Sequence, residues 1–85
     1  MTDEVLYFSA IWCAPCRVVS TNVERLKIQY PQVKFTKVDV DQEAAAASTF
    51  QIRSVPTLVH LQDGKEVARV VGAKTVDDLA KGLRL

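Results

Sequence analysis

Two cysteines separated by two residues are the side chains of this sequence best suited to covalent chemistry. Cys13 and Cys16 are its only cysteines, and both lie in the segment Cys13-Ala14-Pro15-Cys16. In the chain-entropy model, a disulfide across so short a loop stabilises a fold by only about 2 kcal/mol, against about 4.7 kcal/mol for a 100-residue loop. The spacing therefore indicates thiol–disulfide exchange rather than a structural cross-link.

The pair is expected where a strand ends and a helix begins. The free N–H groups and the positive dipole end of a helix N-terminus favour the thiolate at Cys13, which makes it the nucleophile. Cys16 follows one turn later and is placed to attack the mixed disulfide that Cys13 forms. Pro15 suits the first turn, because its missing N–H would have no partner there.

The elements that position this pair are predicted in the order βαβαββα. Strands are expected over residues 5–8, 33–40, 57–61 and 67–71, and helices over about 14–30, from 44 to near 50, and from 76 onward. Apolar residues at Val19, Val23 and Leu26 give the first helix one buried face. Pro31 ends this helix, since proline disfavours the helical conformation of the residue before it.

Local signals mark the other boundaries. Asp41 is expected to cap the second helix, and Thr75 with Asp78 makes a capping-box-like start for the third. Asp63-Gly64 predicts a hairpin turn between the last two strands, which are therefore antiparallel. A strand–helix–strand crossover makes the first two strands parallel. The fold class is α/β, with a four-stranded mixed sheet, helices on both faces and one domain over residues 1–85.

Composition excludes several functional classes. Eleven Lys and Arg residues balance ten Asp and Glu residues, for a net charge of +1, without the basic surface typical of nucleic-acid-binding proteins. Apolar runs are far shorter than the roughly 20 residues of a membrane span. The first four residues include two acidic ones, Asp3 and Glu4, where a secretory signal is basic. We expect a cytoplasmic protein that binds neither nucleic acid nor membranes.

Zinc binding is the alternative use of two neighbouring cysteines. A zinc site needs three or four protein ligands, and His60, the single histidine, has no ligand spacing relative to the pair. We expect no bound metal, and we interpret His60 as a strand residue at a thinly covered surface.

Two motifs of the chain resemble the thioredoxin family. Trp12-Cys13-Ala14-Pro15-Cys16 is similar to the thioredoxin active site, which normally has glycine in place of Ala14. Val55-Pro56-Thr57 is similar to the cis-proline element that lies opposite it in that fold. The resemblance runs from Leu6 to Leu83 and agrees with the βαβαββα order predicted independently, so we expect a minimal thioredoxin fold.

The resemblance implies reduction of protein disulfides, with attack by Cys13, resolution by Cys16 and a cis Val55-Pro56 bond whose backbone holds the substrate peptide as an added strand. The residues implied in the active-site loop and in substrate binding are Trp12, Ala14, Pro15, Val55, Pro56, Thr57 and Gly72. It also implies a monomer without a bound cofactor. Electrons are expected from NADPH through a thioredoxin reductase or a similar reductase.

The chain departs from the family pattern at three places. It lacks the initial strand and helix of full-length thioredoxins, so one sheet face is expected to be covered only by the helix near residues 44–47. Tyr7 stands where thioredoxins usually carry a buried aspartate that assists the second cysteine, and its unperturbed pKa of about 10 makes it a poor base. Lys37, the neighbour of that acid, remains, and both residues are candidates for tuning pKa values. Ser9 and Ala14 replace an aromatic residue and a glycine.

Two other functions compete with this interpretation. A glutaredoxin-like protein recharged by glutathione fits the short N-terminus, but it does not fit Pro15 or the strand over 67–71. A non-catalytic binding module of the same fold has no need for two thiols at a helix start.

Overall fold

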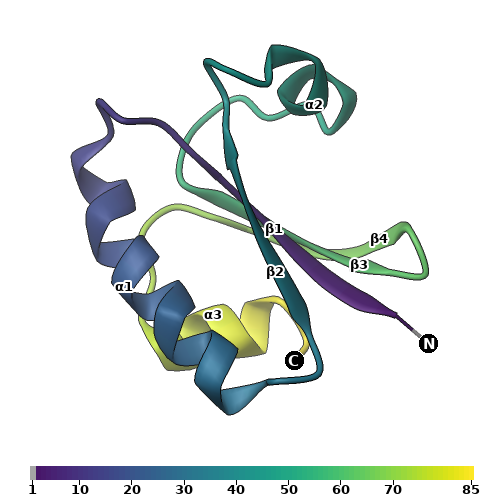
Figure 1. Cartoon of the computed structure of the whole chain (residues 1–85). Helices are drawn as coiled ribbons and strands as arrows, with labels where there is room; N and C mark the ends of the chain where they lie inside the picture. The colour runs from purple at the N-terminus through teal and green to yellow at the C-terminus, as the bar shows by residue number, and fades with distance from the viewer. Residues whose placement is uncertain (1) are drawn as a thin grey trace.

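The computed structural model describes residues 2–85, and its elements confirm the predicted order (Figure 1). The strands are β1 (Asp3–Ser9), β2 (Lys34–Asp39), β3 (Thr57–Gln62) and β4 (Lys65–Val71). The helices are α1 (Ala14–Gln29), α2 (Ala44–Thr49) and α3 (Val76–Gly82). The first and last strands are longer than predicted; β4 continues to the turn because Lys65 still pairs with Gln62.

The four strands form one mixed sheet in the order β2-β1-β3-β4. β1 runs parallel to β2 and antiparallel to β3, and β3 and β4 form the predicted antiparallel hairpin. Asp63 and Gly64 both have positive φ, as this tight turn requires. β1 is therefore central, and its carboxyl end leads directly to the cysteine pair.

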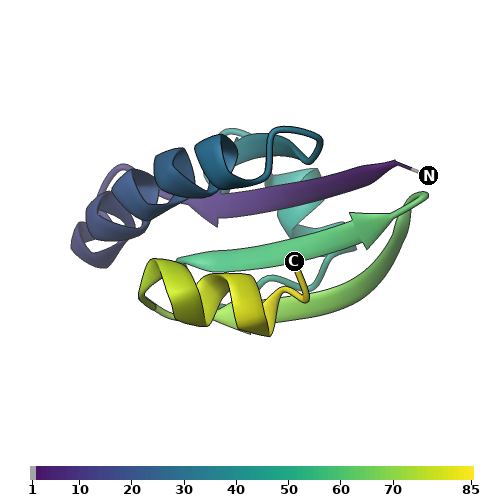
Figure 2. The ribbon, with the colours of Figure 1, turned by 90° about the horizontal axis from the view of Figure 1, so that it is seen from below.

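Helices cover both faces of the sheet, as predicted. Figure 1 shows α1 and α3 side by side, with α2 apart from both, and Figure 2 shows α3 against the hairpin of β3 and β4, where it contacts β4. Side chains of β1 alternate between the faces: Val5 and Tyr7 pack with the residues of α1 and α3, whereas Phe8 packs on the α2 side. On that side Phe50 and Ile52 supply much of the cover.

The predicted helix signals are partly confirmed. In α1 the residues Val19, Val23 and Leu26 are buried, and the helix gives way at Tyr30 before Pro31. In α3 the Thr75 hydroxyl accepts a hydrogen bond from the N–H of Asp78 (3.2 Å), which confirms the predicted cap.

The cap predicted at Asp41 is wrong. The N-cap of α2 is Glu43, whose side chain makes no capping hydrogen bond. The Asp41 carboxylate instead accepts a hydrogen bond from the indole N–H of Trp12, a partner 29 positions away in the sequence.

The surface position predicted for His60 is also wrong. Its side chain is 1% exposed and lies on the face covered by α1 and α3. The Nδ1–H donates to the carbonyl oxygen of Leu83 (2.6 Å), and Nε2 lies 3.0 Å from a carboxylate oxygen of Asp3. His60 thus joins the C-terminal end of α3 to the start of β1. Separately, no helix in residues 2–85 is long and apolar enough to cross a membrane.

Gly82 allows α3 to lie close to β4, and we expect Gly82→Ala to destabilise the protein by about 1 kcal/mol. A Cβ at this position would lie 2.5 Å from Cγ2 of Val70. Overpacking of this kind lowers stability by about 1–3 kcal/mol, which outweighs the roughly 1 kcal/mol that alanine gains over glycine in a helix. Urea unfolding measures the change. Lys81→Ala, at the exposed neighbouring position, is the control, and a stabilised Gly82→Ala variant would contradict the close approach.

Candidate active site

Cys13 and Cys16 are joined by a disulfide at the start of α1, with their Cα atoms 5.3 Å apart. Cys13 is the N-cap residue, in extended conformation, and its Sγ accepts a hydrogen bond from the N–H of Cys16 (3.2 Å). Its own N–H donates to the carbonyl oxygen of Ala10 (3.1 Å). The two residues are only 5% and 3% exposed. The sulfur of Cys13 therefore takes the place of the side-chain oxygen that usually caps a helix.

The surroundings of the disulfide favour negative charge on sulfur after reduction. The first turn of α1 contains no acidic residue, and the N–H of Cys16 is directed at the sulfur of Cys13. The helix dipole acts in the same direction. A thiolate at Cys13 thus has both a hydrogen-bond donor and a favourable field, which is the arrangement that thiol–disulfide exchange requires.

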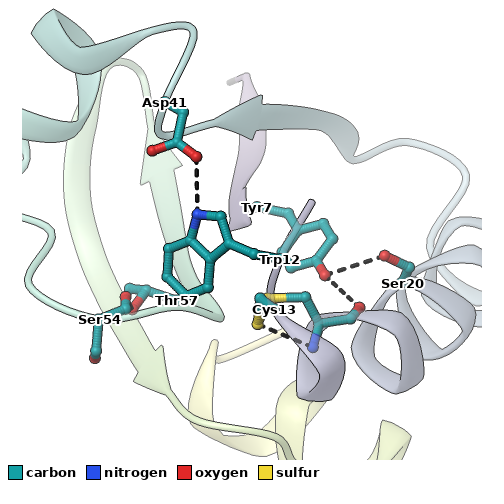
Figure 3. The surroundings of a disulfide bond; sticks show 8 residues. Tyr7, Trp12, Cys13, Ser20, Asp41, Ser54 and Thr57 are labelled. Carbon is teal, nitrogen blue, oxygen red and sulfur yellow. Dashed lines mark hydrogen bonds between the residues drawn. A yellow bond between two sulfur atoms is a disulfide. The ribbon is translucent and has the colours of Figure 1, made fainter. Parts of the chain in front are cut away.

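Tyr7 lies beneath the disulfide and is 2% exposed. Its hydroxyl donates a hydrogen bond to the carbonyl oxygen of Cys16 (2.6 Å) and is also hydrogen-bonded to the Ser20 hydroxyl (3.1 Å), as Figure 3 shows. Burial raises the pKa of the Tyr7 phenol above its ordinary value, and the hydrogen bond to Ser20 only partly offsets this. Tyr7 is therefore a neutral donor that fixes the first turn of α1, not a base.

Tyr7 gives a testable pH dependence. Because its pKa is raised on folding, the folded chain holds this proton more tightly than the unfolded chain. The resulting contribution to stability is present below the unfolded pKa of about 10 and is lost as pH rises through the folded pKa. We expect one of the two tyrosines to form phenolate late in an ultraviolet absorbance titration.

The matching substitution is Tyr7→Phe. This variant should lack the late phenolate signal and should lose about 1 kcal/mol of stability near neutral pH, because it removes the two hydrogen bonds of the hydroxyl. Tyr30→Phe serves as the control, and persistence of the late titration in Tyr7→Phe would contradict the assignment.

Lys37 lies close to Tyr7 on the same face of the sheet, and its side chain is exposed. Its Nζ is 5.9 Å from the centroid of the Tyr7 ring, within cation–π range. The register of the parallel strands pairs Tyr7 with Lys37 and Ser9 with Asp39. The structure thus brings together the two residues predicted to tune the site, and it adds Asp39 beside them.

Trp12 is held in place although its side chain is 68% exposed. Its Nε1–H donates to Oδ2 of Asp41 (2.8 Å), at the turn that follows β2. Figure 3 shows the indole between Asp41 and the turn that contains Ser54 and Thr57. A small cavity of about 130 Å³ lies between Trp12 and Val55.

The predicted cis Val55-Pro56 peptide bond is present. The Thr57 hydroxyl donates to the carbonyl oxygen of Ser54 (2.7 Å), which closes the turn before β3. The N–H of Gly72 donates to the carbonyl oxygen of Pro56 (2.9 Å), so these two predicted residues meet. Gly72 has φ 98°, in the left-handed region that glycine adopts without strain.

The donor set does not favour a metal centre. Within residues 2–85, no group of three or more His, Cys, Asp or Glu side chains is placed to hold a metal ion. His60 is engaged by Leu83 and Asp3 and is not available to the cysteines.

Sequence reasoning missed three side chains at this site: Ser20, Asp39 and Asp41. One signal for the two aspartates was available, because they follow β2, and ligand sites of open α/β sheets lie at the carboxyl ends of the strands. Ser20 had no such signal, since its role depends on how α1 crosses β1.

Sequence comparison with known proteins matches this chain to thioredoxins. The family model described as Thioredoxin matches residues 2–84. The chain is 44% identical over 69 residues to Thioredoxin-1 of Saccharomyces cerevisiae, covering 81% of this chain and 67% of that protein. It is 43% identical over 67 residues to a thioredoxin of Chlamydia pneumoniae, covering 79% of this chain and 66% of that one.

A third relative is much longer. The chain is 48% identical over 69 residues to a TPR repeat-containing thioredoxin of Arabidopsis thaliana, covering 81% of this chain but only 18% of that protein. The chain thus spans about two thirds of the two shorter relatives and a small part of this one.

Solved structures agree with the sequence comparison. Thioredoxin from Fasciola hepatica superposes with a TM-score of 0.90 at 41% identity, covering 98% of this chain and 79% of that one. The oxidized form of mitochondrial thioredoxin 3 from Saccharomyces cerevisiae gives 0.89 at 33% identity, covering 96% and 76%.

Proposed function

This chain belongs to the thioredoxin family, and we propose that it is a thiol–disulfide oxidoreductase that reduces protein disulfides. The observation that carries the proposal is the Cys13–Cys16 disulfide at the N-terminus of α1, where the N–H of Cys16 donates to the sulfur of Cys13. A sulfur held in this way is stabilised as a thiolate, which is the attacking form in disulfide exchange.

In the proposed reaction, the reduced protein uses its two thiols in sequence. The Cys13 thiolate attacks one sulfur of the substrate disulfide and releases the other as a thiolate. Cys16 then loses its proton and attacks the Cys13 sulfur, which breaks the mixed disulfide and releases the second substrate thiolate. The product is the Cys13–Cys16 disulfide that the structure contains.

The substrate is proposed to bind across the loop that carries the cysteines. Trp12 and the neighbouring Ile11 are exposed apolar side chains on one side of the pair, and Val71 is exposed at the end of β4. The turn at Val55 and Pro56 offers backbone groups for a peptide in extended conformation. Ala14, Pro15, Thr57 and Gly72 complete the proposed contact surface.

Electrons are proposed to come from NADPH through a thioredoxin reductase, with no cofactor bound to the chain itself. We further propose one thioredoxin-like domain over residues 1–85, acting as a monomer in the cytoplasm, where a reducing thiol pool keeps the pair active.

Reduction of insulin, followed by its precipitation, tests the proposed activity. With NADPH and thioredoxin reductase as the only electron source, the chain should catalyse precipitation well above the rate without it. Activity only with glutathione and glutathione reductase would assign the chain to glutaredoxin-like chemistry instead. No catalysis with either source, or with dithiothreitol, would refute the proposed function.

The reduction potential of the pair discriminates the same possibilities independently. Titration against a thiol buffer, with Trp12 fluorescence as the signal, should give about −270 mV, the value of thioredoxin itself. A value near −200 mV, typical of glutaredoxins, or near −120 mV, typical of a disulfide donor, would contradict the thioredoxin-type assignment.

A further inference from the structure

A cavity lies beside the disulfide, on the side of Cys16 that faces β1 and β2. It has a volume of about 250 Å³ and is lined by both cysteines, by Ser9 and Ser20, and by three charged side chains, those of Arg17, Lys37 and Asp39. A water molecule needs about 10–15 Å³ of volume measured in this way, so the cavity has room for several. The polar lining supplies the partners that such waters need.

Asp39 is the carboxylate of this cavity. In the register of β1 and β2, Ser9 pairs with Asp39 and Tyr7 pairs with Lys37. Because strand side chains alternate, Lys37 and Asp39 lie on the same face as Tyr7, the face that α1 covers. Cys16 is the buried residue of α1 that lines the same cavity.

The Asp39 side chain is fixed in orientation. Its Oδ1 accepts hydrogen bonds from the N–H groups of Asp41 (2.8 Å) and Gln42 (3.3 Å). No hydrogen bond joins its second oxygen, Oδ2, to another group among residues 2–85. The carboxylate thus has one oxygen that anchors it and one that is free to accept a proton.

We propose that Asp39 accepts, through water in this cavity, the proton that Cys16 loses when it resolves the mixed disulfide. The proposal rests on the proposed function and adds a residue to it. In this step the Cys16 S–H proton passes to a cavity water, which gives a proton to Asp39. The Cys16 thiolate attacks the Cys13 sulfur, the bond between Cys13 and the substrate breaks, and the substrate leaves as a thiolate. Electrons move from Cys16 to the substrate sulfur, and no other reactant is needed.

The other titratable groups around Cys16 do not serve as acceptors. Tyr7, from β1, is a neutral phenol that donates to the Cys16 carbonyl. Arg17, from α1, and Lys37, from β2, are cations, and a guanidinium is always protonated in proteins. Both cations favour the thiolate once the proton has left. Asp41 is directed to Trp12.

The test separates the two steps of the reaction in the reduced 85-residue chain. Excess 4,4′-dithiodipyridine, an uncharged aromatic disulfide, releases one thiopyridone when Cys13 attacks and a second when Cys16 resolves. In stopped-flow absorbance, Asp39→Asn should slow the second release about 10-fold near neutral pH. This is less than the roughly 10²-fold or more of a direct general base, because the proton passes through water. The first release should stay within about twofold, and the deficit should shrink as pH rises and hydroxide replaces the carboxylate.

The Asp39→Asn side chain retains an Oδ1 that accepts the two backbone hydrogen bonds, so the turn is preserved. Glu43→Gln removes the same charge from an exposed residue outside the cavity and should resolve at the wild-type rate. Asp39→Glu should recover part of the lost rate.

Three results would overturn the proposal: an unchanged second release in Asp39→Asn, an equal slowing of both releases, or a deficit that does not depend on pH. Failure of the proposed function gives a different result, which is seen in the wild-type chain. A wild-type chain that releases both equivalents but does not reduce insulin refutes the proposed protein substrates and leaves the Asp39 measurement valid. A wild-type chain that releases only one equivalent refutes both.

Discussion

Replacing Cys13 with serine is expected to reduce the rate of protein-disulfide reduction on the order of 10³-fold or more. A serine hydroxyl remains protonated at neutral pH and does not attack a disulfide, so the first step has no nucleophile. The hydrogen bond from the N–H of Cys16 and the field of α1 stay in place, but they have no thiolate to stabilise. Insulin reduction with each electron source measures the loss.

Cys16→Ser should fail in a different way. Cys13 still attacks, but the mixed disulfide has no internal thiol to resolve it, so a covalent complex with the substrate accumulates. Mass spectrometry under non-reducing conditions detects this complex. Because the two cysteines act in one sequence, the double variant should be no slower than Cys13→Ser alone.

The two single variants also separate catalysis from mere binding. If the biological activity of the protein stayed intact in both variants and in the variant that combines them, the enzyme assignment would fail. The chain would then be a non-catalytic binding module. Circular dichroism of each variant, compared with the reduced wild-type chain, shows that any loss of activity is not a loss of fold.

Replacing His60 with alanine is expected to lower the free energy of unfolding by about 3 kcal/mol. The imidazole is 1% exposed and bridges Leu83 at the end of α3 and Asp3 at the start of β1. The variant loses the packing of a buried ring and creates a cavity in its place. It also leaves the buried carbonyl oxygen of Leu83 without its hydrogen-bond donor. Each of these effects lowers stability by on the order of 1 kcal/mol or more.

For a chain of this size such a loss is a large fraction of the total stability, since single domains are stable by only about 5–15 kcal/mol. The midpoint of thermal unfolding should fall by roughly 12–24 °C. Gln62→Ala, two positions further along β3 on the same face and less buried, is the control and should change stability by no more than about 0.5 kcal/mol. A His60→Ala variant as stable as this control would show that the bridge contributes nothing.

His60 also separates stability from catalysis. The residue lies under the C-terminal end of α3 and contacts neither cysteine. At temperatures where His60→Ala remains folded, it should reduce insulin at close to the wild-type rate.

Much of the site follows from short-range features of the sequence. The cysteine spacing, the apolar run before it and the helical spacing after it place Cys13 at the start of α1. Pro31, Asp63-Gly64 and Thr75 mark a helix end, a hairpin turn and a helix start, and the structure has all three. Each of these signals acts through backbone groups no more than a few residues away, so each can be predicted without knowledge of the fold.

The failed predictions concern partners that are distant in the sequence. Asp41 satisfied the local rule for a helix cap, yet its carboxylate binds Trp12, and His60 had no local feature that distinguished burial from exposure. Both outcomes depend on which strands are neighbours and on where α3 ends, and neither is encoded in a short segment.

The sequence by itself determined the reactive pair, the order of the elements and the turns and caps that delimit them, because these depend on interactions within a few residues. Only the tertiary structure decided what surrounds the pair. The parallel register of β1 and β2 places Ser9 beside Asp39, and the crossing of α1 over β1 brings the Tyr7 hydroxyl to Cys16 and Ser20. Such contacts form only when the whole sheet and its helices have packed, since a shift of one residue in register would turn every side chain of a strand to the opposite face.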